Sequence, residues 1–388
     1  MPGYELVGKE EQEQLNEIFK TSNGVLFAHG FNNLRNNRFR VREFENKFSS
    51  KIGSKFTQAT TSGTVAQAIA MLAMGVGKGD EVITQSHTFV ATVESILAIG
   101  ATPVLVDIDE TYNMCPISLE NAITNRTKLI VPVHMLGNPA RMNEIQKIAD
   151  KYDLAVLEDA CEALGAKYDG KYVGTISEAG IFSLDFAKTI TTGEGGLIIT
   201  DDEKIYKYCK EYHDHGHESN PNYPRGRDTR SLPGMNYRMS EMQGAVGLAQ
   251  LKKLDFIVSK SRENKKIIKD NINNGKIKFR ELTDEDGDLG DTLIFNFSNK
   301  NQAKAFLKKY NEMGYFTKNI PDAIDWHFAG TWNHMFKEVD RYKDTWHYEW
   351  DRSTKLLERS ISIPIYIKSS YEDLEQNIQS INKALDQI

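Results

Sequence analysis

Between about residues 55 and 250, short apolar runs alternate with segments of helical periodicity, and this alternation restricts the possible folds more than any other feature. Runs without polar alternation are typical of parallel strands that are buried on both faces. Strands that alternate with helices predict an α/β fold with a mostly parallel sheet. The clearest strand patterns are Val82–Ile83, Thr102–Asp107, Leu129–Val133 and Leu154–Leu157.

Past Asp255 the pattern changes to longer charged helices with fewer strands. We expect helices over Ile257–Ile272, Asn301–Met313 and Tyr371–Ile388, and a strand over Thr292–Phe297. A chain of 388 residues exceeds a typical single domain. The sequence therefore predicts a large domain over residues 1–255, with an N-terminal helix and a substrate loop, and a smaller α+β domain over residues 256–388.

The segment Gly180–Gly196 holds the most informative lysine. Its first apolar run, Ile181–Leu184, is typical of a buried strand, and Lys188 follows it. A lysine just beyond a buried strand is poorly hydrated, which is expected to lower its pKa and leave an amine that can attack a carbonyl. Most lysines are solvated surface charges, so this segment alone does not decide between the two interpretations.

Glu158 and Asp159 follow the apolar run Leu154–Leu157. Ligands of open α/β sheets lie beyond the carboxyl ends of the strands. An aspartate in that place can keep a heteroaromatic nitrogen protonated, as in pyridoxal phosphate enzymes. The alternative is an aspartate that caps the next helix.

Two further segments fit a flat, phosphorylated ligand. Ser62, Gly63 and Thr64 precede a helix-forming run, and the free N–H groups of a helix N-terminus suit a phosphate. Phe89 follows another strand pattern, where its ring could stack on a planar ligand or could belong to the core.

In this order these segments resemble the DegT/StrS-type sugar aminotransferases, and the resemblance covers nearly the whole chain. It implies the fold of the aspartate aminotransferase-like enzymes (pyridoxal phosphate-dependent transferases of fold type I), with a mostly parallel, mixed seven-stranded sheet. The matching residues are Ser62–Thr64, Phe89, Pro132–Met142, Glu158–Asp159, Ser183, Lys188, Gly193–Gly196 and Gly234–Leu251.

The resemblance implies a role for each matching residue. Lys188 would form a Schiff base with pyridoxal 5′-phosphate (PLP) and carry the proton, while Asp159 would pair with the ring nitrogen; pyridoxamine 5′-phosphate would be present in the second half-reaction. Phe89 would hold the ring plane. Ser62, Gly63, Thr64 and Ser183 would bind the phosphate, together with Asn236 of the partner subunit, so that a homodimer shares its active sites.

Position 162 departs from the family pattern. Family members commonly carry Gln near the phenolic oxygen of PLP, where this chain has Glu162. A carboxylate there has to be protonated or paired, which leaves its role open. Sugar 3-dehydratases of the same family replace the lysine with histidine, so Lys188 predicts transamination.

The substrate is predicted from further segments. His213–Glu218, Pro224–Thr229 and Trp326–Trp332 resemble the subgroup that aminates 8-keto-3,8-dideoxy-octulosonate, giving an amino sugar of lipopolysaccharide. The alternative acceptor is a nucleotide-linked keto-deoxyhexose, and the resemblance implies L-glutamate as the amino donor. Candidate substrate contacts are Arg38, Arg40, His215, Arg225, Arg227 and His327.

Other classes of protein are less well supported. A PLP-binding regulatory protein would keep the cofactor without turnover. A zinc hydrolase could use His213, His215 and His217, but no fourth ligand is evident, so no metal is expected. The net charge of −6 argues against nucleic acid as a partner. Three scattered cysteines and the lack of a signal segment or membrane-length apolar run favour the cytoplasm.

Overall fold

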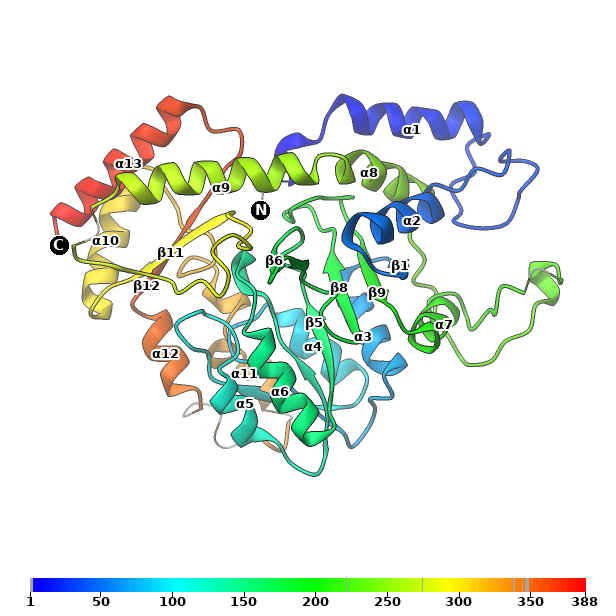
Figure 1. Cartoon of the computed structure of the whole chain (residues 1–388), viewed down its shortest axis with the longest axis horizontal. Coiled ribbons are helices and arrows are strands. Elements are labelled where there is room, and N and C mark those ends of the chain that lie inside the picture. Colours follow the sequence, from blue (N-terminus) through cyan, green and yellow to red (C-terminus); the bar gives the residue numbers. More distant parts are fainter. Residues whose placement is uncertain (1–2, 221, 274, 338, 344, 346–348) are drawn as a thin grey trace.

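The computed structural model describes residues 3–388 except 221, 274, 338, 344 and 346–348. Its centre is a seven-stranded sheet in the order β1-β9-β8-β5-β4-β2-β3 (Figure 1). Only β9 among these strands runs antiparallel to its neighbours, so the sheet is mixed and mostly parallel, as the sequence predicts. The strands are β1 Phe56–Thr60, β2 Glu81–Gln85, β3 Thr102–Val106, β4 Thr127–Val131, β5 Ala155–Asp159, β8 Ala179–Ser183 and β9 Gly196–Thr200.

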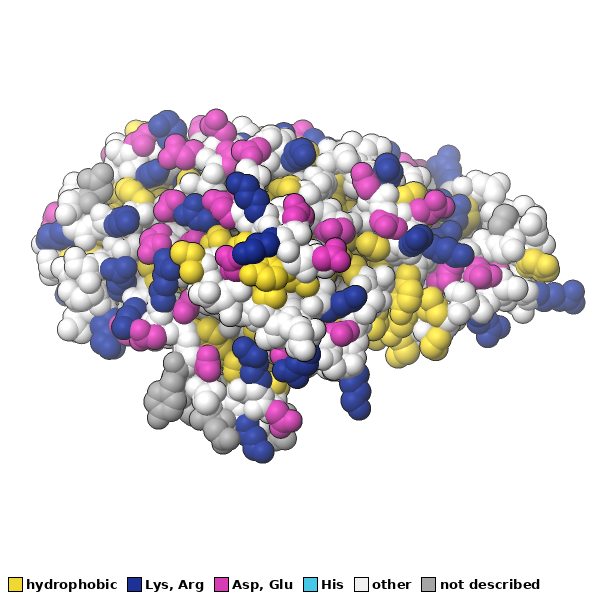
Figure 2. Space-filling view, turned by 60° about the horizontal axis from the view of Figure 1, so that its bottom comes forward, with side chains coloured by type: hydrophobic (Ala, Val, Ile, Leu, Met, Phe, Trp, Pro, Cys, Tyr) yellow, Lys and Arg dark blue, Asp and Glu magenta, His cyan; other side chains and the backbone are white. Residues whose placement is uncertain are grey.

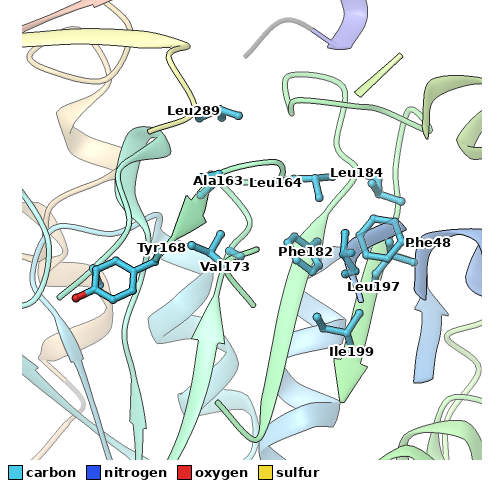
Figure 3. Close-up of a cluster of buried hydrophobic side chains, with 14 of the residues drawn as sticks. Phe48, Ala163, Leu164, Tyr168, Val173, Phe182, Leu184, Leu197, Ile199 and Leu289 are labelled. Atoms are coloured by element: carbon cyan, nitrogen blue, oxygen red, sulfur yellow. The ribbon is translucent and has the colours of Figure 1, made fainter. Parts of the chain in front are cut away.

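Helices cover both faces of this sheet. Neighbouring residues of each strand point to opposite faces, and both sets of side chains are apolar and buried. Phe182 and Leu197 belong to one buried cluster, part of which Figure 3 shows, whereas Ile181 and Ile198 belong to the cluster on the other face. One face packs against α2 Arg40–Ile52, α5 Pro116–Ala122, α6 Met142–Tyr152 and α8 Glu241–Leu251, and the other against α3 Gly63–Ala73, α4 Val90–Ala98 and α7 Glu203–Tyr212. Both faces are apolar, which explains the near-continuous hydrophobic runs.

A second unit follows α8. The long helix α9 Leu254–Asn271 leads away from the large sheet to an antiparallel sheet in the order β10-β11-β12 (Figure 1). This unit has its own apolar cluster, centred on Phe295 and Phe306. Its elements are β10 Lys278–Phe279, β11 Thr292–Asn296, β12 Ser360–Pro364, α10 Lys300–Glu312 and α13 Tyr371–Asp386.

Part of the C-terminal half returns to the large sheet. Trp332, Phe336 and Trp350 pack in one cluster with Val93 and Leu105. The junction of α8 and α9 lies where the sequence divides the chain, and we keep a boundary at residue 255 as a proposal. The sequence does not reveal the short helices of the returning segment, α11 Asn333–Phe336 and α12 Asp351–Leu357, or the hairpin β6 Lys167–Tyr168 and β7 Lys171–Tyr172.

The N-terminal part consists of a short 3-10 helix, η1 Gly3–Leu6, and the charged helix α1 Lys9–Thr21. Basic and acidic side chains are interspersed over the face shown in Figure 2. None of the helices in the described ranges is both long enough and apolar enough to cross a bilayer.

The close contact between β9 and the start of α3 generates a prediction about stability. A Cβ atom at Gly196 would lie 2.1 Å from the carbonyl oxygen of Ser62. We expect Gly196→Ala to lower the free energy of unfolding by about 1–3 kcal/mol, because main-chain atoms must move apart. Urea denaturation measures this change. Gly77→Ala is the control, since a Cβ there meets no atom within 4 Å. Equal effects of the two substitutions would contradict the prediction.

Candidate active site

A cavity of about 520 Å³ opens at the carboxyl ends of β5 and β8. Asp159 is the last residue of β5, and Ser183 is the last residue of β8. Lys188 and Phe89 also line the cavity. Ligands of open α/β sheets bind at this edge, and the volume lies within the range of small-molecule sites.

Asp159 is fixed at the base of the cavity. Thr92 Oγ1 donates to Asp159 Oδ2 at 3.0 Å, Gln67 Nε2 to the same oxygen at 3.3 Å, and the N–H of Cys161 to Oδ1 at 3.1 Å. Burial raises the pKa of Asp159 above its ordinary value, while the hydrogen bonds from Cys161 and Thr92 oppose this shift. A buried carboxylate held in this way is suited to pair with a cationic ligand nitrogen.

The N-terminus of α3 forms another wall. Ser62 caps this helix and accepts the N–H of Val65 at 3.2 Å, and Gly63 and Thr64 follow it in the cavity lining. A Cβ at Gly63 would lie 2.8 Å from the Cβ of Ser183. The two segments therefore meet only because this position is glycine, and together they provide main-chain N–H groups and hydroxyls for an anion.

Lys188 faces a buried carboxylate. Its Nζ lies 3.6 Å from Glu162 Oε1, and His327 Nε2 lies 3.7 Å from the same oxygen. Burial favours the neutral form of Glu162, but the positive charges of Lys188, His327 and Lys318 outweigh it and lower its pKa to about 2. Of the two states that the sequence allows for Glu162, protonated or paired, the structure shows the paired one.

The expected pKa of Lys188 is wrong in its direction. Burial disfavours the ammonium form, as the sequence suggests, but the neighbouring carboxylates, Glu162 first among them, outweigh burial and raise the pKa of Lys188. In the chain alone, Lys188 is an ammonium group held beside Glu162. The sequence could not show this, because the effect depends on a distance between two loops.

The Phe89 ring borders the same cavity. Its centre lies 5.8 Å from Lys188 Nζ and 5.4 Å from the centre of the His327 ring. Phe89 is 38% exposed, although it lies just before a buried helix. An aromatic ring left uncovered in a cavity is suited to contact a flat ligand, which favours the stacking interpretation over the core interpretation.

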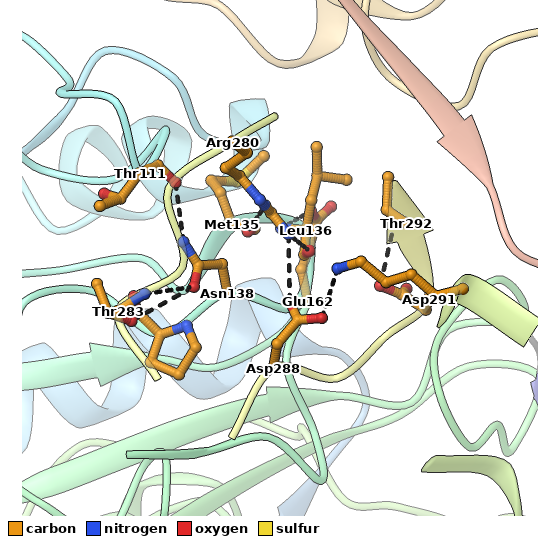
Figure 4. Close-up of polar contacts among 12 residues, drawn as sticks. Thr111, Met135, Leu136, Asn138, Glu162, Arg280, Thr283, Asp288, Asp291 and Thr292 are labelled. Atoms are coloured by element: carbon orange, nitrogen blue, oxygen red, sulfur yellow. Dashed lines mark hydrogen bonds and ion pairs between the residues drawn. The ribbon is translucent and has the colours of Figure 1, made fainter. Parts of the chain in front are cut away.

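The loop after β4 contacts Glu162, and Figure 4 shows Met135, Leu136 and Arg280 in the same polar cluster. The N–H of Leu136 donates to Glu162 Oε2 at 3.3 Å. The buried guanidinium of Arg280 donates to the carbonyls of Met135 and Leu136 at 3.1 and 2.9 Å, and it pairs with Asp288 at 3.3 Å. Because Leu136 has a left-handed backbone (φ 50°), these contacts hold a conformation that a leucine rarely adopts.

A buried histidine anchors the same loop to β5. His134 Nδ1 accepts the N–H of Ala140 at 2.9 Å, so its proton is on Nε2, which donates to Glu158 at 3.1 Å. Glu158 also accepts the N–H groups of Gly174, Ile176 and Ser177. Burial raises the pKa of Glu158, but these hydrogen bonds and His134 outweigh it and lower the pKa. The residue beside Asp159 is therefore fixed as well.

The other predicted site residues whose side chains the structure describes lie outside this cavity. Arg38 and Arg40 line a separate hollow, in which Arg40 Nη1 lies 3.2 Å from Glu43 Oε2. His215 and Arg227 are exposed, and the side chain of Arg225 lies outside the described part of the chain. Among the five predicted substrate residues with described side chains, His327 is the one that the structure brings to the cavity of the same chain. Asn236 is exposed, and its assignment to the partner's site stays a prediction.

The three histidines of the segment His213–His217 have separate surroundings. His213 lies 3.1 Å from Gln58 through Nε2, while His217 Nδ1 lies 3.7 Å from Asp228. Within the described ranges, no group of three or more His, Cys, Asp or Glu side chains is placed to hold a metal ion.

Several cavity residues escaped the sequence analysis. The sequence could have revealed two of them. Gln67 is a long polar residue in a mostly apolar helix, and Thr92 lies one helical turn after Phe89, on the same side of α4. Lys318 and Asn319 come from the C-terminal unit and carried no such signal. Lys318 donates to Asp291 at 2.7 Å beside the cavity.

Replacing Glu162 tests the charge pair. Its folded-state pKa of about 2 lies below the ordinary value of 4.5, so its stabilisation is present above pH 4.5 and is lost as the pH falls toward 2. We expect the stability difference between the wild type and Glu162→Gln to narrow between about pH 5 and pH 3, and the pKa of Lys188 to fall in the variant.

Thermal unfolding of cofactor-free protein across this pH range measures the first effect, and the pH dependence of acylation at Lys188, followed by mass spectrometry, measures the second. The control is Glu194→Gln, because Glu194 lines the cavity without an ion pair to Lys188 among the described contacts. A constant stability difference would contradict the prediction.

Comparisons with known proteins show which family the chain resembles. GDP-perosamine synthase of Escherichia coli O157:H7 is 42% identical over 234 residues, which are 60% of this chain and 63% of that protein. An uncharacterized protein of Methanocaldococcus jannaschii is 34% identical over 97% of this chain and 96% of its own.

The structure of an aminotransferase from Psychrobacter cryohalolentis is 28% identical, with a TM-score of 0.85 and 98% of both chains covered, which confirms the expected fold. A model of the DegT/DnrJ/EryC1/StrS aminotransferase family matches residues 21–382. Aminotransferases of this family use PLP, as the sequence predicts. The chain belongs to the DegT/DnrJ/EryC1/StrS aminotransferase family.

Proposed function

We propose that the protein is a PLP-dependent aminotransferase that converts a keto sugar into an amino sugar, with an amino acid, L-glutamate, as donor. The observation that carries this proposal is the convergence of Lys188, Asp159 and the N-terminus of α3 on one cavity. Family membership supports the reaction class.

The residues of the cavity fit PLP. Gly63 lets the N-terminus of α3 pack directly against Ser183, because a Cβ there would lie 2.8 Å from the Ser183 Cβ, and main-chain N–H groups at this helix N-terminus suit a phosphate. Asp159 supplies a buried carboxylate for the ring nitrogen, and Lys188 supplies the amine. Phe89 offers an uncovered ring face. We assign the phosphate to Ser62, Gly63, Thr64 and Ser183, with Asn236 of the partner subunit completing the site in a homodimer.

When bound, PLP supplies an electron-withdrawing ring that stabilises the negative charge left when a donor carbon loses its proton. Asp159 keeps the ring nitrogen protonated, which requires the carboxylate to stay ionised. Lys188 Nζ removes the proton from the α-carbon of the donor and delivers a proton to the sugar carbon that receives the amino group. In the chain without PLP, Glu162 lies 3.6 Å from Lys188 Nζ and holds this group beside the cavity, and Lys188 acts as the base only in its neutral form.

We infer that the acceptor is 8-keto-3,8-dideoxy-octulosonate, which would place the enzyme in lipopolysaccharide synthesis. The segments His213–Glu218, Pro224–Thr229 and Trp326–Trp332 support this acceptor by resemblance, and His327 from the last segment lies in the cavity. The second candidate is a nucleotide-linked keto-deoxyhexose. It is favoured by the similarity to GDP-perosamine synthases, which are 42% and 43% identical over part of the chain.

Substitution of the two central residues tests the mechanism. We expect Lys188→Ala to reduce aminotransfer by at least about 10²–10⁴-fold, because the proton carrier is lost. Asp159→Asn should slow the glutamate half-reaction by about 100-fold, or about 2.7 kcal/mol. Stopped-flow absorbance with glutamate measures both. Asp150→Asn, on the exposed side of α6, is the matched control, and a Lys188→Ala variant with wild-type rates would exclude the proposed mechanism.

A substrate panel separates the two acceptors. We expect the glutamate-loaded enzyme to transfer its amino group to 8-keto-3,8-dideoxy-octulosonate, with kcat/KM at least about tenfold above that for a GDP- or dTDP-linked 4-keto-6-deoxyhexose, equal to about 1.4 kcal/mol. Mass spectrometry of the amino sugar products measures this preference. Turnover of the nucleotide-linked sugars alone would refute the octulosonate proposal and leave the aminotransferase proposal intact.

A further inference from the structure

The first residues of the chain touch the main chain of the catalytic lysine. The N–H of Gly3 donates to the carbonyl of Lys188 at 2.9 Å. Gly3 is buried there, and a Cβ at this position would lie 2.6 Å from that carbonyl oxygen and 3.0 Å from the Cα of Ile190. Only glycine allows this approach, so the contact depends on the residue type at position 3.

The side chains that follow Gly3 extend the contact in two directions. The ring of Tyr4 stacks on Phe186, with ring centres 5.0 Å apart and an angle of 21°. The carboxylate of Glu5 accepts the N–H of Lys368 at 2.9 Å and that of Ile367 at 3.4 Å. The segment thus joins the loop of residues 185–192, which we call the lysine loop, to the chain just after β12.

A second connection reaches the lysine loop from the start of α1. Glu11 accepts a hydrogen bond from Gln250 Nε2 at 2.9 Å, and Gln250 Oε1 accepts the N–H of Thr191 at 3.3 Å. Lys253 pairs with Glu11 at 2.7 Å and donates to the carbonyl of Leu6 at 2.6 Å. Residues 3–11 therefore hold the lysine loop at Lys188 and, through Gln250, at Thr191.

We propose that residues 3–11 position the catalytic lysine by fixing the main chain of the lysine loop. This inference rests on the proposed function for the identity of the lysine as catalytic. The contact acts through the main chain of Lys188 rather than through substrate, so Gly3 and Glu5 are positioning residues. Figure 1 shows the start of the chain near the middle of the molecule, beside the junction of α8 and α9.

Positioning matters because the reaction tolerates little displacement of Lys188. Lys188 Nζ must reach both Glu162 at 3.6 Å and the reacting carbon. A misplacement of about 1 Å can lower a rate by about 100-fold. The lysine loop has hydrogen bonds of its own, such as Thr192 N–H to the carbonyl of Leu184 at 2.9 Å, and the bond from Gly3 adds a restraint at the carbonyl of Lys188 itself.

The test compares two glycines of the same segment. Gly3→Ala introduces a methyl group against the Lys188 carbonyl, whereas Gly8→Ala adds one where no atom lies within 4 Å. In the purified full-length chain, we expect Gly3→Ala to speed amide hydrogen exchange of the peptide covering residues 185–192 and to slow the glutamate half-reaction by about 10–100-fold. The KM for glutamate should change little, and Gly8→Ala should match the wild type.

A second variant distinguishes the proposed effect from a general folding defect. Glu5→Gln leaves the main chain intact and weakens the connection to Lys368. We therefore expect its increase of exchange in the same peptide and its loss of kcat to be smaller than those of Gly3→Ala. Exchange and half-reaction rates equal to those of Gly8→Ala in both variants would overturn the proposal.

Amide exchange does not require turnover, so the two hypotheses can fail separately. A wild-type chain without a glutamate half-reaction, whose Gly3→Ala variant still shows faster exchange at residues 185–192, would refute the proposed function and retain the contact as a restraint on this loop. An active wild type whose Gly3→Ala variant shows unchanged exchange and unchanged rates would refute the positioning role and retain the proposed function.

Discussion

The site depends on one close main-chain contact, between the beginning of β9 and the beginning of α3. Gly196 lies against the Ser62 carbonyl, and Gly63 lies against Ser183. With any side chain at these two glycines, the helix would move away from the sheet edge. The free N–H groups of α3, the hydroxyl of Ser183 and the loop that carries Lys188 would then no longer face one cavity.

The second constraint is electrostatic. A cavity that contains Asp159 and Glu162 would be unfavourable for two buried carboxylates without partners. Lys188 and His327 lie beside Glu162, whereas Thr92, Gln67 and the N–H of Cys161 satisfy Asp159. The two carboxylates have different partners, because Glu162 is paired with cations whereas Asp159 accepts hydrogen bonds from neutral donors. This difference lets the two neighbouring carboxylates serve different partners.

The fold and the central residues were predictable, because they leave local patterns. Buried strands appear as apolar runs, and Asp159 and Lys188 lie two and four residues after such runs. The pKa direction of Lys188 was not predictable, since it depends on Glu162, which lies on another loop. Arg280 and Lys318 were missed for the same reason, because nothing in their own segments marks them as neighbours of the cavity. The returning helices α11 and α12 were missed because they are short.

The buried guanidinium of Arg280 also bears on the order in which the molecule is completed. All seven strands of the large sheet precede residue 201, but the carbonyls of Met135 and Leu136 find their charged donor only in the C-terminal unit. Synthesis proceeds from the N-terminus. A nascent chain can therefore assemble its sheet while the loop after β4 still lacks its charged donor, and this part of the site is completed only after Arg280 has been synthesised.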